Sequence, residues 1–109
     1  MADTLKVLGQ QAPSATTETD LYTVPASTQA LGSTLVVCNR GGTSTTFRIS
    51  VSVGGGVTAN KDYTHYDCTI LANDSLTITI GISLSATDKV RVYAGNANLS
   101  FALFGMERT

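Results

Sequence analysis

Charged residues are scarce in this chain of 109 residues. Lys, Arg, Asp and Glu make up 14% of it, whereas a typical soluble domain carries roughly 25%. The chain has no run of Lys and Arg, and its formal net charge is −1. Nucleic acid is therefore not expected as a partner, because its binding depends on a basic surface. A surface with so little charge also indicates that another protein covers part of it.

The residue types that build most active sites are also rare. The chain has one histidine, His65, two cysteines, Cys38 and Cys68, and no tryptophan. Strict alternation in the strand-like run 62–68 places His65 and Cys68 on opposite faces, where a base and a nucleophile cannot meet. We therefore predict no catalytic residues and no enzymatic activity. The two cysteines are expected to be free, buried thiols, because the chain shows no export signal.

Signals for metals, cofactors and membranes are missing as well. Zinc needs about four Cys or His ligands, and Asp62, Asp67, Asp74 and Asp88 do not form the dense pattern of a calcium loop. The triplet Gly54–Gly56 is not followed by the Lys-Ser/Thr ending of a phosphate loop. No stretch approaches the ~20 apolar residues of a membrane span. We expect no metal, no cofactor and no membrane contact, and we expect synthesis in the cytoplasm.

Threonine is abundant, with seventeen residues, and much of the chain alternates apolar and polar side chains. A β-branched side chain with a hydroxyl suits a strand that has one face in water. Gly, Asn, Asp and Pro bound the alternating segments and favour turns there. The segments expected as strands are 5–10, 19–24, 34–39, 45–53, 63–71, 75–80, 89–92 and 99–103.

About eight short strands at a spacing of about 8–12 residues are typical of a sandwich or jelly roll. We predict an all-β fold, namely a single β-sandwich of about eight short antiparallel strands, jelly-roll-like, that spans residues 1–109. Residues 1–18 are expected to form an N-terminal arm and loop. The turn at Arg40–Thr43 is expected to close a hairpin between segments 34–39 and 45–53.

Two features predict that the chain associates with other subunits. Phe104 lies on the face opposite Phe101 near the end of the last strand, a pattern typical of a strand that is covered on both sides. An apolar run also lies close to the N-terminus, and a terminus frays unless it is tied down. The residues predicted to form the interface are Leu5, Val7, Leu8, Phe104 and Met106.

Several sequence strings resemble a known class of proteins. The strings are Lys6–Gln10, Leu21–Pro25, Val36–Gly41, Asn73–Asp74, Thr87–Tyr93 and Asn98–Gly105. Together they resemble small virion structural proteins of tailed bacteriophages, and the resemblance runs nearly from end to end. It implies a β-sandwich without catalytic residues that binds the major capsid protein or other virion subunits.

The resemblance implies, first, a capsid decoration (cement) protein that binds and stabilises the assembled head. Such a protein would be made in the host bacterial cytoplasm and reside in the virion. The class also implies a homo-oligomer, with a trimer favoured. A second hypothesis is a tail, collar or baseplate component of the same virion. A third is a carbohydrate-binding sandwich, for which the sequence offers scattered tyrosines but no tryptophan.

Overall fold

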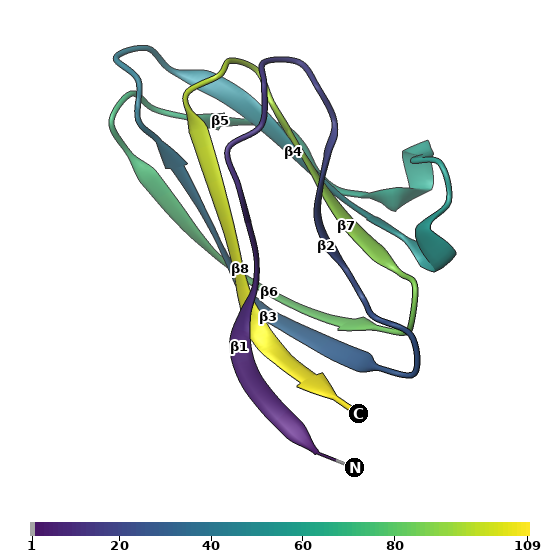
Figure 1. The fold of residues 1–109 in the computed structure, drawn as a ribbon. Coiled ribbons are helices and arrows are strands. Elements are labelled where there is room, and N and C mark those ends of the chain that lie inside the picture. Colours follow the sequence, from purple (N-terminus) through teal and green to yellow (C-terminus); the bar gives the residue numbers. More distant parts are fainter. Residues whose placement is uncertain (1) are drawn as a thin grey trace.

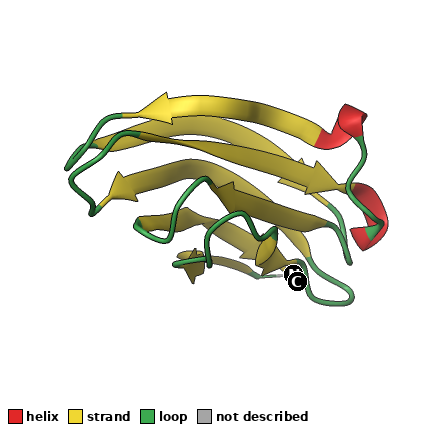
Figure 2. Ribbon diagram, turned by 90° about the horizontal axis from the view of Figure 1, so that it is seen from above, coloured by secondary structure: helices red, strands yellow, loops and turns green. Residues whose placement is uncertain are grey.

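The computed structural model describes residues 2–109 as two stacked antiparallel sheets (Figures 1 and 2). The strands are β1 (Asp3–Gln11), β2 (Thr19–Thr23), β3 (Gln29–Asn39), β4 (Thr45–Ser52), β5 (Tyr63–Ile70), β6 (Ser75–Leu84), β7 (Lys89–Ala94) and β8 (Leu99–Arg108). Two short 3-10 turns, η1 (Val53–Gly55) and η2 (Asn60–Asp62), lie between β4 and β5. The predicted all-β sandwich of eight strands is confirmed.

The strands are distributed over the sheets in the order of a jelly roll. Sheet A has the order β1-β8-β3-β6 and sheet B has the order β2-β7-β4-β5. Every pairing within the sheets is antiparallel. Among these eight strands only β4 and β5 are both consecutive and paired, and every other connection crosses from one sheet to the other. This is the arrangement of an eight-stranded double-sheet jelly roll.

The predicted hairpin at Arg40–Thr43 is wrong. This turn connects β3 in sheet A to β4 in sheet B, so the two strands lie in different layers. The Asn39 side-chain amide donates to the carbonyls of Thr43 and Leu71 (2.9 and 3.2 Å), and its oxygen accepts from Gly41 N–H. One buried side chain thereby holds together two crossings between the sheets. A turn sequence shows that the chain reverses, but not which strand it then pairs with.

The core lies between the sheets and is built from the inward-facing half of each alternating strand. Leu35 and Val37 of β3, and Leu99 and Leu103 of β8, are completely buried. Residues of sheet B face them, and the rings of Phe47 and Phe101 meet edge to face with centroids 6.3 Å apart. The opposite half of each strand therefore faces away from the core, and that half determines what the molecule presents to a partner.

Bulges interrupt three strands of sheet A, β1, β3 and β6, at neighbouring positions. The register shifts between Val7 and Gly9 in β1 and between Gly32 and Thr34 in β3, and Gly81 in β6 has a φ of +56°. At Gly105 in β8, an added Cβ would overlap the backbone carbonyl of Leu31. Bulges bend a sheet and fix its register. They therefore also fix which side chains of sheet A point outward.

Candidate functional site

The outward-facing side of sheet A carries no charged side chain between its two ends. We call this surface the outer A face and define it by the residues that lie opposite the core positions in the strand register. Its members are Leu5, Val7 and Gln10 of β1; Ser100, Ala102, Phe104 and Met106 of β8; Leu31, Thr34, Val36 and Cys38 of β3; and Ser75, Thr77, Thr79 and Ser83 of β6.

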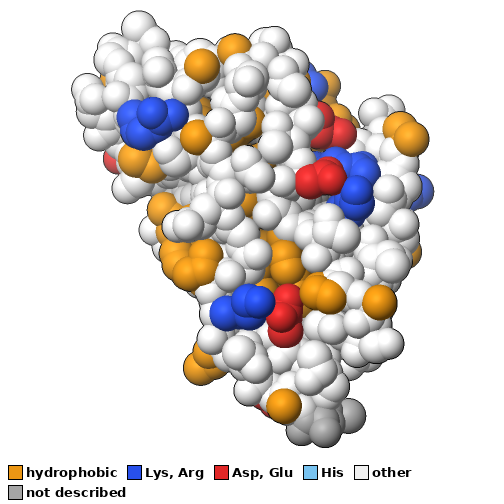
Figure 3. Space-filling view, viewed as in Figure 1, with side chains coloured by type: hydrophobic (Ala, Val, Ile, Leu, Met, Phe, Trp, Pro, Cys, Tyr) orange, Lys and Arg blue, Asp and Glu red, His pale blue; other side chains and the backbone are white. Residues whose placement is uncertain are grey.

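Apolar side chains form rows across three strands of this face. Leu5 pairs with Met106, which pairs in turn with Leu31, and Val7 pairs with Phe104. Leu5 is 84% exposed and Phe104 is 37% exposed. The rows are flanked on β6 by hydroxyl side chains. In Figure 3, hydrophobic side chains gather beside β8 and β1, next to an acid–base pair. Exposed apolar side chains that gather on one face are typical of a protein–protein contact.

Charges mark only the two ends of the outer A face. At one end the Arg108 guanidinium donates two hydrogen bonds to the Asp3 carboxylate (2.7 and 3.1 Å), and these bonds lower the pKa of Asp3. At the other end Arg40 donates to Ser100 Oγ (2.8 Å) and to the carbonyl of Ala97 (3.2 Å). The space between these ends is uncharged, so a partner can cover it without desolvating an unpaired ion.

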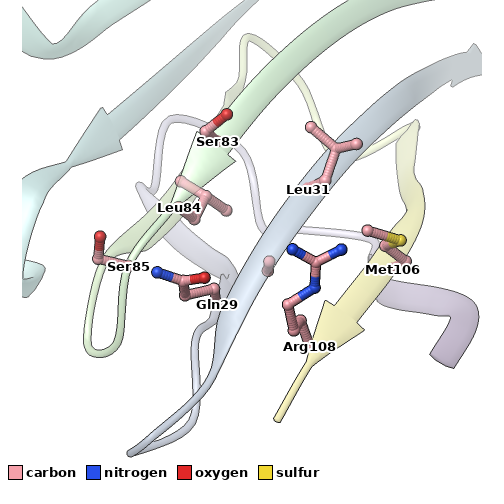
Figure 4. Close-up of a pocket in the computed structure, with 8 residues that line it drawn as sticks. Gln29, Leu31, Ser83, Leu84, Ser85, Met106 and Arg108 are labelled. Atoms are coloured by element: carbon pink, nitrogen blue, oxygen red, sulfur yellow. The ribbon is translucent and has the colours of Figure 1, made fainter. Parts of the chain in front are cut away.

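Two shallow hollows lie on the same face. The first, of about 320 Å³, lies between β3, β6 and β8, and Figure 4 shows Leu31, Met106 and Arg108 around it. The second, of about 390 Å³, lies towards the opposite end, and Gln10, Val36 and Ala102 contribute to its lining. The face is thus corrugated, with raised apolar side chains between two depressions.

The structure brings four of the five predicted interface residues together. Leu5 and Val7 of β1 lie beside Met106 and Phe104 of β8 on the outer A face. Leu8 is placed differently, because alternation along β1 turns its side chain to the face opposite Leu5 and Val7, into the core, where it is 8% exposed. The predicted arm is likewise an edge strand along residues 3–11, paired with β8 of the same chain.

Sequence reasoning missed the contribution of β3 to this surface. Leu31 and Val36 extend the apolar rows beyond β8. A signal was present in the run Leu35–Cys38, where apolar residues occupy both alternating sets of positions. Such a run is typical of a strand that is covered on both faces.

A partly buried polar triad lies beneath the outer A face and connects both sheets. The Tyr22 hydroxyl of β2 donates to Glu107 Oε2 of β8 at 2.5 Å, and Lys6 Nζ of β1 lies 3.1 Å from Glu107 Oε1. Tyr22 is 7% exposed. Burial and the neighbouring carboxylate raise the pKa of Tyr22. The hydrogen bond from Tyr22, with a smaller contribution from Lys6, lowers the pKa of Glu107.

Tyr22→Phe is expected to lower the free energy of unfolding by about 1 kcal/mol at neutral pH, because the half-buried Glu107 carboxylate loses the donor Tyr22. A lowered pKa contributes stability above the unfolded-state value of about 4.3, and this contribution is lost as the pH falls through the folded-state value. The variant should therefore lose less stability than the wild type on acidification below about pH 4.3. Urea unfolding at pH 7 and pH 3 measures both effects. An unchanged acid dependence would contradict this role for the triad.

The outward side of sheet B is charged and aromatic, in contrast to the outer A face. The Arg48 guanidinium lies over the rings of Tyr66 and Tyr93, 4.2 and 4.5 Å from their centroids. It also donates to both carboxylate oxygens of Asp67 (2.7 and 3.4 Å). Tyr63 meets Tyr66 edge to face at 4.9 Å. These cation–π and ionic contacts hold the cluster rigid.

Arg91 fixes the glycine-rich loop that follows β4. Its guanidinium donates to the carbonyls of Gly55 and Gly56 (3.1 and 2.6 Å) and to Thr58 Oγ1 (2.9 Å). The Asp88 carboxylate accepts from Gly54 N–H at 2.8 Å. Val53 and Val57 are 78% and 95% exposed on this loop. The glycine-rich loop is therefore a fixed projection with two apolar side chains.

Arg91→Ala is expected to release residues 54–58 while leaving the sandwich folded, because five hydrogen-bond acceptors lose their donor. Amide hydrogen exchange of this loop should accelerate by roughly tenfold or more, since exchange reports local opening. Arg40→Ala is a matched control, because that guanidinium contacts Ser100 and Ala97 instead. Equal exchange in both variants would show that Arg91 does not hold the loop.

The prediction that His65 and Cys68 point to opposite faces is wrong. Asp67 has a φ of +50°, and the β4–β5 register shifts at this point. This bulge adds one residue, so His65 opposite Ile49 and Cys68 opposite Phe47 both face inward. The His65 ring stacks against Phe47 at 6.3 Å, and its Nδ1 is 3.0 Å from Thr64 Oγ1. These contacts give His65 a packing role.

The cysteines and aspartates have structural surroundings. Cys38 on the outer A face and Cys68 on β5 are both free and half-buried. Asp74 accepts from Ser75 N–H, and Asp62 accepts from Ala59 N–H. Such bonds are typical of turn residues. Within residues 2–109, no three His, Cys, Asp or Glu side chains lie close enough together to hold a metal ion. The same residues include no helix long and apolar enough to cross a membrane.

Comparison with known proteins does not assign the chain to a family. No protein-family model matches the chain, and no curated protein matches it.

Proposed function

We propose that this chain is a structural protein of a bacteriophage virion, and specifically a capsid decoration protein. In this role it binds the major capsid protein in the assembled head and stabilises the shell. The observation that carries the proposal is the outer A face, a four-stranded surface without charge that exposes apolar side chains. The resemblance of the sequence strings to virion proteins supplies the biological setting.

A decoration protein needs a rigid body and an adhesive surface, and the jelly roll provides both. The fold alone does not decide the function, because jelly rolls occur in capsid proteins, lectins and enzymes alike. The surface supports adhesion, because the transfer of apolar side chains from water into a protein contact is favourable. Binding at many equivalent sites of a shell lets modest contacts add up. Binding to the assembled state alone stabilises that state.

The proposal is tested by adding the recombinant protein to purified empty capsids that lack it. We expect the protein to co-sediment with the capsids at a fixed ratio, and we expect the decorated capsids to withstand higher temperatures. A decoration role would be contradicted if the capsids sedimented without the protein, or if capsids that had bound it withstood no higher temperature than bare capsids. Copy number separates the tail, collar or baseplate alternative, since roughly hundreds of copies per virion indicate the head and about a dozen indicate the tail.

A carbohydrate-binding role is a second candidate, and one observation favours it. Tyr66 is 56% exposed beside the carboxylate of Asp67, and an aromatic ring next to a polar group can bind a sugar. Arg48 already occupies a face of Tyr66, which reduces the room for a sugar ring. Glycan-array binding that Tyr66→Ala abolishes would favour this function over adhesion to the shell. Loss of glycan binding in Tyr63→Ala as well would strengthen the case for a carbohydrate-binding role.

A further inference from the structure

We propose that strand β6, at the edge of sheet A, is the contact between two copies of this chain. The two β6 strands pair antiparallel and join the two four-stranded sheets A into one continuous sheet. This pairing goes beyond the proposed function, because it uses an edge of sheet A and leaves the outer A face open to the shell. Three properties of β6 carry it, namely its unprotected edge, its half-buried inward side chains and its self-complementary sequence.

The backbone of β6 is unpaired along one side. Sheet A ends at β6, which pairs only with β3 (Figure 1). In the described part of the chain, residues 2–109, no hydrogen bond reaches residues 76–83 other than those of the ladder to β3. The N–H and C=O groups of alternate residues in such an edge strand point away from the neighbouring strand, so they are available to a further strand.

The other three edge strands carry features that oppose pairing with a further strand. β1 carries Lys6, β2 has only five residues and carries Asp20, and β5 has a bulge at Asp67. Charges, short strands and bulges are the usual means by which sheet edges avoid unwanted pairing. Segment 75–80 of β6 has no charged residue, no proline and no bulge, and the first irregularity follows at Gly81. β6 is therefore the edge that is open to pairing.

The inward side chains of β6 are incompletely covered by the single chain. Leu76 and Ile78 pack against the core but are only half-buried. Their partners on β3, Val37 and Leu35, are completely buried at the same level of the sheet. A second β6 strand would cover this row from the open side, and apolar cross-strand pairs stabilise a sheet. The edge therefore offers apolar surface together with free backbone groups.

The sequence of β6 is complementary to itself in an antiparallel pair. When the pair is centred on Ile78, Thr77 of one copy lies opposite Thr79 of the second copy, and Leu76 lies opposite Ile80. Apolar side chains then meet on the inward side and hydroxyls on the outward side, and both kinds of cross-strand pair are favourable. This register uses the whole segment before the bulge. The strand that fits the β6 edge, uncharged and with alternating apolar residues, is thus β6 of a second copy.

The pair is closed, and it presents both outer A faces in the same direction. The two-fold axis of an antiparallel strand pair is perpendicular to the sheet, so the outward sides of the two sheets A lie side by side. One body then carries two adhesive faces, and two weak attachments to a shell add up. The joined sheet ends at two β1 strands, whose Lys6 side chains oppose further growth. Because the pair uses one edge twice, it closes at two chains and not at the trimer that the resemblance implies.

The pairing is tested by the mass of the full chain in solution and by amide hydrogen exchange. One strand pair buries less area than a standard interface, so pairing should depend on concentration. In sedimentation equilibrium the mass should approach twice the chain mass of 11.4 kDa at the highest concentrations. Alternate amides of residues 75–81 should become protected from exchange over the same range, whereas the amides of β1 should be unchanged.

Two double variants test the antiparallel register. Thr77→Lys combined with Thr79→Lys sets like charges directly opposite each other across the contact, and this should raise the dissociation constant by roughly tenfold or more. Thr77→Glu combined with Thr79→Lys is the matched control, because it sets opposite charges against each other at the same two positions. This variant should pair about as tightly as the wild type. Both positions are exposed, and circular dichroism shows whether each variant is folded.

Several results would overturn the pairing. They are a mass of one or three chains at all concentrations, equal dissociation constants for the two double variants, or protection of β6 that appears only when capsids are added. The last result would identify a segment of the shell as the strand that pairs with β6. Capsid binding is scored separately, in the co-sedimentation experiment. A single chain that binds capsids contradicts the pairing alone, whereas a pair that does not bind them contradicts the proposed function alone.

Discussion

Replacement of Phe101 by alanine is expected to lower the free energy of unfolding by about 3–5 kcal/mol, the range for truncation of a buried aromatic side chain. Phe101 is 2% exposed and meets Phe47 from the opposite sheet. Its removal leaves a cavity at the contact between the two layers, which a closely packed core fills only in part. A domain of this size has roughly 5–15 kcal/mol of stability in total, so the variant should be close to unfolding.

Phe104→Ala is the matched control, because it removes the same side chain three positions along the same strand. Phe104 points to the outer A face and is 37% exposed. At concentrations where the chain is single, its loss should cost less than about 1 kcal/mol. Urea unfolding of dilute protein measures both variants. Equal losses for Phe101→Ala and Phe104→Ala would contradict the assignment of inner and outer sides on β8.

Gly105→Ala is expected to destabilise the domain by an amount at or above the upper end of the ~1–3 kcal/mol typical of overpacking. The added Cβ would overlap the backbone carbonyl of Leu31 on the neighbouring strand, and a backbone atom cannot move aside as a side chain can. The expected result is a large fall in the melting temperature, accompanied by loss of the local β3–β8 register.

Gly42→Ala controls for the general effect of replacing a glycine. No atom lies within 4 Å of a Cβ built at Gly42, which is exposed in the turn after β3. Its melting temperature should stay within a few degrees of the wild type, since surface substitutions usually change stability by less than ~0.5 kcal/mol. If Gly105→Ala and Gly42→Ala have the same melting temperature, the close approach of β8 to β3 does not exist in solution.

The strands themselves could be predicted, because alternation is a local property of the sequence. Segments such as 75–80 and 99–103 show the period of two that a half-buried strand imposes. The structure extends both, to Leu84 and to Arg108. In β6 the extension follows a bulge at Gly81, where the register shifts and the simple alternation ends. Boundaries are therefore least predictable where a bulge interrupts the pattern.

Strand pairing and side-chain orientation could not be predicted from the sequence, for physical reasons. A jelly roll pairs strands that are distant in the chain, and a turn such as Arg40–Thr43 carries no information about the sheet that receives the next strand. A bulge adds one residue and reverses the side to which all later residues point. For this reason Cys68 shares a face with His65.

The candidate site could be predicted in part. The sequence predicts Phe104 as an interface residue because it lies on the face opposite Phe101. It predicts Leu5 and Val7 because they are apolar residues near a terminus. Their alignment into rows depends on the pairing of the first strand with the last, which no local pattern encodes. The absence of charge from the whole face also becomes visible only when four separate strands are placed side by side. The low content of charged residues in the composition is the sequence feature that indicates this uncharged face.

We propose that the outer A face is covered when the protein assembles. Hydroxyl-radical footprinting tests it directly, by comparing the oxidation of side chains in dilute, single chains with that in assembled protein. Phe104 and Met106 should become protected on assembly, whereas Tyr66, 56% exposed on the opposite sheet, should be oxidised at an unchanged rate. Unchanged oxidation of Phe104 and Met106, with protection of Tyr66 instead, would contradict the claim and transfer the contact to sheet B.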